Sequence, residues 1–384
     1  MPERILGVGV AGTGAFARAQ HLPNLARIPA ARLVALWNRS EPRLVETSQR
    51  WPAELVTTDY AAFLAHPGLD VVVIAAGDAV QADLATRALL AGKHVYCEKP
   101  LAETAASGAS VVAAQRASGC RLAVGFNRRH APACRRAKAL LTGKAGPWTA
   151  TARFIDDACW RWGKDLPPGS LIVHDLCHLF DLLRWLSGDE ITAVSCWSAR
   201  PDDDLVQVRL AGGTVASLHL SGHGSNDMPK ERLEIIAGRG GLVIDEFVEL
   251  RTFGWADAPA VERFAGHSHP DREFGPRLLY GQLGLDGVLA VRRSAQELRW
   301  KLERGELSGG DADEARAYLS RLLATFTVDK GWRNSLAAFI HGIISGETTD
   351  HAGAADALIA NAAARAAVTS RDLGGALVAI DPTG

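Results

Sequence analysis

Short apolar runs alternate with helical patterns along the first part of the chain. Val71–Ala76 is a β-branched run bounded by Asp70 and Gly77, which is typical of a strand buried on both faces. Strands that alternate with helices in this way indicate βαβ units and a parallel sheet. We expect strands at residues 5–10, 32–37, 71–76, 94–97 and 122–125, and helices at 15–26, 42–49, 80–91 and 104–118.

The pattern changes after residue 125. Short strands then follow one another, and Ala211-Gly212-Gly213 between two of them is a hairpin signature. Such runs predict an antiparallel sheet in an α+β domain. We expect strands at 148–154, 191–198, 205–210, 214–221, 231–237 and 241–245, a helix at 170–187 and a helical tail at 312–369. Residues 255–310 have weak periodicity, so we expect an irregular insertion there.

Composition and charge exclude several classes of protein. The 384 residues are 47% apolar, and the net charge of −1 lacks the basic excess of a nucleic-acid binder or a polybasic membrane anchor. No apolar run approaches the roughly 20 residues of a spanning helix, and the N-terminus lacks the pattern of a signal peptide. None of the six cysteines stands in a C-x-x-C pair, so we expect reduced thiols in a cytoplasmic protein.

A glycine-rich turn follows the first expected strand. Residues 12–17 fit the pattern G-x-G-x-x-A between a strand and a helix. In that pattern Gly12 permits the tight turn, Gly14 lets the backbone approach a pyrophosphate, and amides at the helix start bind the anion. We therefore predict a dinucleotide site with contacts from Gly12, Thr13, Gly14, Ala15 and Phe16.

The end of the second strand bears on which dinucleotide binds. NAD-binding proteins usually carry an acid there for the ribose 2′-hydroxyl. This chain has Asn38-Arg39-Ser40 instead, with no acid before Glu41. An asparagine does not repel a phosphate, and the guanidinium of Arg39 is suited to pair with one. The sequence therefore favours NADP over NAD.

Glu98-Lys99-Pro100 follows the expected strand at 94–97. Ligands of an open parallel sheet bind beyond the carboxyl ends of its strands, so Lys99 is expected where a nicotinamide would lie. Pro100 is suited to fix this turn through a cis peptide bond.

These segments together resemble the glucose–fructose oxidoreductase / inositol dehydrogenase (Gfo/Idh/MocA) family. The resemblance is carried by the glycine-rich turn, by residues 91–102 around Lys99, by residues 124–129, and by His178-Leu179-Phe180-Asp181, which is similar to the family's H-x-x-D helix. It implies an oxidoreductase that acts on hydroxyls of sugars or cyclitols. Further cofactor contacts are implied for Ala76, Gly77, Gln81, Glu98 and Asn127.

The resemblance also implies the fold class, an α/β Rossmann domain plus an α+β domain with an open, mainly antiparallel sheet. We expect the NAD(P)-binding domain over residues 1–125, and the domain for substrate binding and oligomerisation over residues 126–384. The C-terminal helices are expected to pack back on the Rossmann domain.

Two departures from the family pattern bear on function. His174, with Asp175 beside it, stands where the family usually has an acid, four residues before the active-site histidine. Gly77, Asp78 and Gln81 stand where the family commonly has Pro-Asn and a later histidine. The first departure affects proton transfer, and the second affects cofactor contacts.

The candidate catalytic residues follow from what alcohol oxidation needs, since a hydride leaves carbon and a proton leaves oxygen. Histidine titrates near neutral pH, so His178 is the expected general base, or the acid in the reverse direction. The ammonium of Lys99 is suited to stabilise the developing alkoxide. His174 and Asp181 lie four residues before and three after His178, on one helix face, so we expect both beside it.

Polar groups and flat apolar rings suit a sugar substrate. We expect it to be contacted by Arg128, Arg129, Trp160, Trp162, Lys164, Asp175 and Asp181. Apolar alternation at 205–210 and 215–220 leaves one sheet face available, so we expect a homodimer or homotetramer through that sheet. No nucleic-acid or membrane partner and no bound metal are expected.

Three alternatives stay open at this point. His174-Asp175-Leu176-Cys177-His178 is similar to the H-E-x-x-H signature of zinc hydrolases, but that hypothesis leaves the glycine-rich turn unexplained. A non-catalytic sensor of NADP(H) or a sugar is compatible with the same fold, because fold does not imply function. NAD-dependent glycoside hydrolysis, in which the hydride returns to the substrate, is not separated from net oxidation by any sequence feature.

Overall fold

The computed structural model describes residues 4–144, 146–161, 167, 169–225, 227–265, 276–325 and 328–380. Contacts within the chain divide it into two compact units. Within the described ranges, the first unit contains residues 4–130 and 331–362, and the second contains residues 131–330 and 363–380.

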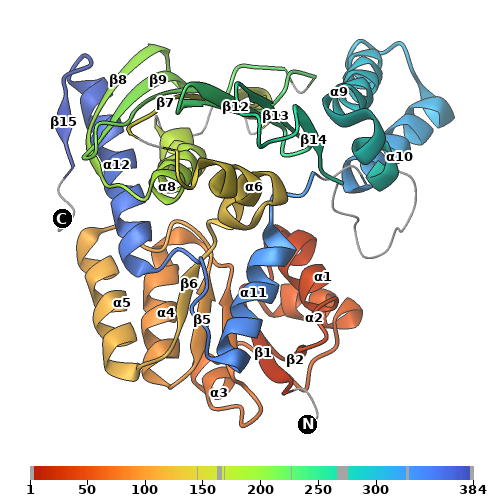
Figure 1. Cartoon of the computed structure of the whole chain (residues 1–384). Helices are drawn as coiled ribbons and strands as arrows, with labels where there is room; N and C mark the ends of the chain where they lie inside the picture. Colours follow the sequence, from red (N-terminus) through yellow and green to blue (C-terminus); the bar gives the residue numbers. More distant parts are fainter. Residues whose placement is uncertain are drawn as a thin grey trace. The chain divides into compact units, whose positions relative to one another are not determined.

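A six-stranded parallel sheet forms the centre of the first unit (Figure 1). Its order, β3-β2-β1-β4-β5-β6, reverses direction between β1 and β4, which is where doubly wound folds bind ligands. The predicted parallel sheet is therefore confirmed. Its strands are β1 (Leu6–Ala11), β2 (Ala31–Trp37), β3 (Leu55–Thr57), β4 (Val71–Ile74), β5 (His94–Cys97) and β6 (Leu122–Val124).

Helices connect these strands, and several begin at polar caps. The carboxylate of Asp59 accepts the backbone N–H groups of Ala61 and Ala62, and Thr104 forms a capping box with Ser107. The helices are α2 (Glu41–Arg50), α3 (Tyr60–Leu64), α4 (Asp78–Leu90), α5 (Ala105–Ser118) and the 3₁₀ helix η2 (Asn127–His130).

The single helix expected over residues 15–26 has a different form. It begins as a π-helical turn, η1 (Ala17–His21), and continues as the short α-helix α1 (Leu22–Leu25). A π-helical turn accommodates one residue more than an α-helical turn, which the spacing of apolar residues did not reveal.

A segment from late in the chain completes the core of the first unit. Helix α11 (Trp332–Ser345) inserts Leu336, Phe339 and Ile340 among strand residues such as Val8 and Val73. Each such side chain, when fully buried, contributes about 1.5–3 kcal/mol. A helix near the C-terminus is thus part of the parallel-sheet unit, together with residues 354–362 of α12 (Ala354–Asp372).

A nine-stranded sheet forms the centre of the second unit (Figure 1). Its order is β14-β13-β12-β11-β7-β10-β9-β8-β15, and of these pairs only β7 and β10 run parallel. The predicted open, mainly antiparallel sheet is confirmed. Its strands are β7 (Thr149–Ile155), β8 (Ile191–Arg200), β9 (Asp203–Leu210), β10 (Val215–Ser221), β11 (Glu231–Ala237), β12 (Gly240–Asp245), β13 (Glu249–Phe253), β14 (Val261–Arg263) and β15 (Val378–Ala379).

The two faces of this sheet differ in burial. Along β9, Val206, Val208 and Leu210 are buried whereas Leu205 is exposed, as the period of two along a strand requires. Helices α6 (Pro132–Leu141) and α8 (Cys177–Ser187) lie along one face (Figure 1). The side chains of Leu205 and its neighbours therefore belong to the opposite face.

The irregular insertion expected over residues 255–310 is wrong for much of its length. Strand β14 and the helix α9 (Pro276–Glu303) occupy this region, and α9 is broken at Gly284. Helix α10 (Gly309–Thr325) lies in the predicted helical tail apart from its first three residues. Among the side chains that the structure describes, the later part of α9 packs a narrow stripe, including Ala295, against Leu319 of α10. Because this stripe is narrow, the apolar period is weak and α9 was missed.

Among the described residues, no helix is long and apolar enough to cross a membrane. All six cysteines are free thiols. The cytoplasmic location stays a prediction.

Candidate nucleotide-binding site

The glycine-rich turn leaves β1 at the point where the sheet reverses direction. Gly12 has φ +97°, and a Cβ there would lie 2.4 Å from the carbonyl oxygen of Ala75. The amide of Gly12 donates to the oxygen of Trp37 at 2.8 Å, which ties the turn to β2. Only glycine fits this close approach of three backbone segments.

The space above Gly14 is open. A Cβ built on Gly14 would meet no atom within 4 Å, and the same is true of Gly77 at the start of α4. The phosphates of a dinucleotide need such uncrowded backbone next to the first turn of a helix. Ala15, Phe16 and Ala76 lie in the same two connections, so the residues present fit a dinucleotide.

Asn38, at the end of β2, contacts predicted residues of two segments. The side-chain amide of Asn38 donates to Oγ1 of Thr13 at 2.7 Å, and its carbonyl oxygen accepts the N–H of Ser40 at 3.3 Å. Thr13 is fully buried, whereas the next residue, Arg39, is exposed. Asn38 therefore joins the strand end to the glycine-rich turn and leaves the guanidinium of Arg39 at the surface.

The connection after β5 is held by α4. The peptide bond Lys99–Pro100 is cis, as the sequence suggested. The buried side chain of Gln81 donates from Nε2 to the carbonyl oxygen of Pro100 at 2.8 Å. Gln81 was predicted to contact the cofactor, and the structure gives it a contact with the Lys99 connection.

Burial and the nearby Glu98 carboxylate set the protonation of the side chains under this connection. Burial, and secondarily the Glu98 carboxylate, raise the pKa of Tyr96 and that of Cys97. The Tyr96 hydroxyl is therefore protonated at neutral pH and shares a 3.0 Å hydrogen bond with Oγ of Ser335. Cys97 is likewise a neutral thiol rather than a thiolate nucleophile.

Sequence reasoning missed His21 in this region. Its Nε2 lies 2.9 Å from Oε1 of Glu98. A histidine in the helix directly after the glycine-rich turn was the available signal in the sequence. Its burial is visible only in the structure.

The predicted substrate residues Arg128 and Arg129 are buried in η2, next to the equally buried Asn127. Nη1 of Arg129 lies 3.4 Å from Oδ2 of Asp356 in α12. This ion pair joins η2 to a distant segment of the same unit. The contacts of these residues with a substrate or cofactor stay predictions.

The predicted catalytic helix belongs to the second unit. His178 and Asp181 are both buried in α8, and Asp181 is fully so. His174 and Asp175 are half-buried in the preceding π-helical turn, η3 (Ile172–Leu176). In a π-helix the backbone hydrogen bonds join residues five positions apart rather than four, so the shared face assumed for His174 and His178 does not follow from α-helical spacing.

The remaining predicted substrate residues are Trp160, Trp162 and Lys164. The backbone of Trp160 lies in the short helix α7 (Ala158–Arg161). Trp162 and Lys164 lie outside the described residues. Within the described ranges, no three His, Cys, Asp or Glu side chains are grouped so as to hold a metal ion.

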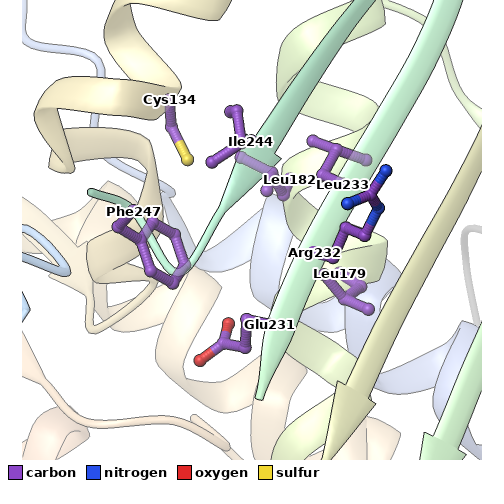
Figure 2. A pocket seen from close by; sticks show the side chains of 8 residues that line it. All are labelled: Cys134, Leu179, Leu182, Glu231, Arg232, Leu233, Ile244 and Phe247. Atoms are coloured by element: carbon purple, nitrogen blue, oxygen red, sulfur yellow. The ribbon is translucent and has the colours of Figure 1, made fainter. Parts of the chain in front are cut away.

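A recess in the second unit lies between α8, α6 and the sheet (Figure 2). Helix α8 contributes Leu179 and Leu182 to it, rather than His178 or Asp181. Its lining is mostly apolar and comprises Cys134, Leu179, Leu182, Glu231, Arg232, Leu233, Ile244 and Phe247. The recess is therefore separate from the predicted catalytic side chains of α8.

Comparisons with known proteins agree with this fold. Residues 6–126 match the profile of the oxidoreductase family with an NAD-binding Rossmann fold, and residues 143–243 match that of the GFO/IDH/MocA C-terminal domain.

Two relatives are inositol 2-dehydrogenases. That of Rubrobacter xylanophilus is 33% identical over 62% of this chain and 70% of its own length, and that of Streptomyces avermitilis is 32% identical over 57% and 66%. An uncharacterised oxidoreductase of Bacillus subtilis, YrbE, is 30% identical, and the match spans only 55% of its length. Several relatives are thus matched over less than two thirds of their length.

Myo-inositol dehydrogenase from Lactobacillus casei, solved with NAD(H) and myo-inositol, has a similar structure. Its TM-score is 0.69 over 98% of this chain and 97% of that one, at 20% identity. At this identity the similarity shows the shared fold.

The glycine-rich turn leads to a testable contrast between two substitutions. Gly12→Ala should lower the free energy of unfolding by at least about 1–3 kcal/mol, because it places a Cβ at positive φ and against Ala75. Gly14→Ala should leave stability unchanged, since its surroundings are open, but should weaken binding of NAD(P)H. Denaturant unfolding and nucleotide fluorescence measure the two effects. Equal stability of Gly12→Ala and the wild type would contradict the close approach of Gly12 to Ala75.

Proposed function

The chain belongs to the Gfo/Idh/MocA oxidoreductase family, and from this premise we propose that it is an NAD(P)-dependent dehydrogenase or reductase acting on a hydroxyl or keto carbon of a sugar, sugar derivative or cyclitol. The observation that carries the proposal is the glycine-rich turn at the reversal point of the parallel sheet, with open space over Gly14. The names of the inositol dehydrogenase relatives support the class of substrate.

When bound, the dinucleotide supplies the hydride acceptor or donor. The protein must hold the substrate hydroxyl and move its proton. We assign Lys99 to stabilise the negative charge that develops on the substrate oxygen. We assign His178 to accept the hydroxyl proton in oxidation and return it in reduction, with Asp181 orienting the ring and His174 beside it.

Turnover is tested by a screen of sugars, sugar acids and cyclitols, followed by the absorbance of NAD(P)H. His178→Ala should lower kcat at least about 100-fold while dinucleotide affinity is retained, because only proton transfer is removed. His341→Ala, at an exposed histidine of α11, is the matched control and should behave as the wild type. Dinucleotide binding without turnover of any compound would favour the sensor hypothesis.

The preference for NADP rests on the end of β2. Asn38 is held by Thr13 in the place where NAD-binding proteins usually have an acid, and Arg39 is exposed next to it. A neutral amide followed by a guanidinium suits a 2′-phosphate better than a free 2′-hydroxyl.

Arg39→Ala should therefore weaken NADPH binding about tenfold, equivalent to about 1.4 kcal/mol, and leave NADH binding nearly unchanged. Arg116→Ala, at an exposed arginine of α5, is the control for loss of one positive charge. Titrations of both nucleotides at low and high salt measure the effect. A wild-type preference for NADH would overturn the NADP assignment.

We also propose that the exposed sheet face joins copies of this chain. The register of the strands places large exposed apolar side chains on that one face, namely Trp197, Leu205, Val215, Ile236 and Phe253. An apolar sheet face of this kind is usually covered.

Light scattering should give a mass at least twice the 40.9 kDa of one chain. The double substitution Leu205→Glu and Val215→Glu should reduce it to one chain mass, because two carboxylates would be desolvated at the interface. Leu90→Glu, at an exposed leucine of α4, should not change the mass. A wild-type monomer would contradict the proposal.

A further inference from the structure

A buried histidine–glutamate pair joins the helix after the glycine-rich turn to the Lys99 connection. Nε2 of His21, the last residue of η1, lies 2.9 Å from Oε1 of Glu98, the first residue after β5. The two side chains are only 4% and 11% exposed. The His21 ring also packs edge-on against Phe16 and Tyr96, with centroids 5.4 and 5.8 Å away.

The Glu98 carboxylate is enclosed from a second side by Gly125. A Cβ on Gly125 would lie 2.8 Å from each carboxylate oxygen, so the absence of a side chain at this position makes the room that the carboxylate needs. The second oxygen, Oε2, accepts the backbone N–H of Lys99 at 3.3 Å. Glu98 thus touches η1, the end of β6 and the peptide of Lys99 at once.

Both neighbours of Lys99 are consequently anchored. Glu98 is tied to His21, and the carbonyl oxygen of Pro100 accepts a 2.8 Å hydrogen bond from Gln81. The Lys99 backbone is therefore held between the glycine-rich turn on one side and α4 on the other.

The π-helical turn brings His21 into this contact. η1 spans Ala17–His21 and carries one residue more per turn than an α-helix would. Without the additional residue, position 21 would shift by one residue step around the helix, about 100° in an α-helix, and its ring would leave the side that faces Glu98. π-helical turns occur frequently at functional sites.

Stability alone is a weak reason for such a pair. Replacing both partners of a buried hydrogen-bonded pair with apolar groups of the same shape can be nearly neutral or stabilising, whereas removing one partner is costly. The position that the His21–Glu98 pair imposes on Lys99 explains the presence of this pair better than stability does.

We propose that His21 and Glu98 are positioning residues that hold Lys99 at the place the bound dinucleotide requires, so that the glycine-rich turn and the Lys99 connection move as one piece. The inference rests on the proposed function. Neither residue touches the reacting atoms, and each acts through the Lys99 backbone. Dinucleotide binding and the environment of the Lys99 amine are therefore coupled through this pair.

The test follows the Lys99 amine by acetylation with acetic anhydride and mass spectrometry, with and without NADPH. In the wild type, NADPH should slow acetylation of Lys99. In His21→Leu, NADPH affinity should fall about tenfold, and protection of Lys99 should be lost even at saturating NADPH. His21→Gln keeps a hydrogen-bond donor for Glu98 and should retain protection.

A second variant separates positioning from stability. His21→Leu with Glu98→Met replaces the pair by apolar groups of similar size, so the melting temperature should return toward that of the wild type. Protection of Lys99 should not return with it. If protection returned together with stability, the pair would be merely structural and the proposal would be overturned.

The chain offers a matched control pair. Nε2 of His66 lies 3.5 Å from Oε2 of Glu54 in the same unit, before the amino end of β4 rather than after the carboxyl end of a strand. His66→Leu should change neither NADPH affinity nor Lys99 protection. An equal loss in both histidine variants would overturn the proposal, whereas failure of the wild type to bind either NADPH or NADH would instead reject the proposed function.

Discussion

The absence of room for a side chain at Gly12 is the constraint on which the binding edge of the first unit depends. The chain leaves β1 between the ends of β2 and β4, and a Cβ at this point would overlap the carbonyl group of Ala75. Because the turn is this tight, Thr13 within it contacts Asn38 at the end of β2. The helix that follows the turn places His21 against Glu98. The parallel sheet thereby gathers the ends of β1, β2, β4 and β5 at one edge.

The same unit depends on segments that are remote in the sequence. Helix α11 supplies Leu336, Phe339 and Ile340 to the core, and Ser335 shares a hydrogen bond with the buried hydroxyl of Tyr96. Arg129 is paired with Asp356 in α12. A binding edge formed by the first strands is thus stabilised by residues that the chain reaches only after strand β14 of the second sheet.

The fold was predicted well where each element buries a broad apolar face. The strand around Val71 is continuously apolar, as in a sheet buried on both faces. The strand around Val206 alternates apolar and polar residues, as in a sheet buried on one face. Both sheets were predicted correctly. Helix α9 was missed because the stripe that it packs against α10 is narrow among the described side chains. The wide turn at Ala17–His21 was missed because a single additional residue hardly alters the local apolar pattern.

By itself, the sequence determined the change from alternating strands and helices to consecutive strands, the glycine-rich turn, the missing acid at Asn38 and the family resemblance, since all of these are local patterns of residues. Only the tertiary structure decided that Asn38 binds Thr13, that Gln81 holds Pro100, and that His21 meets Glu98. These contacts join residues between 19 and 77 positions apart. Local propensity carries no information about such pairs, because their geometry is set by how the elements pack.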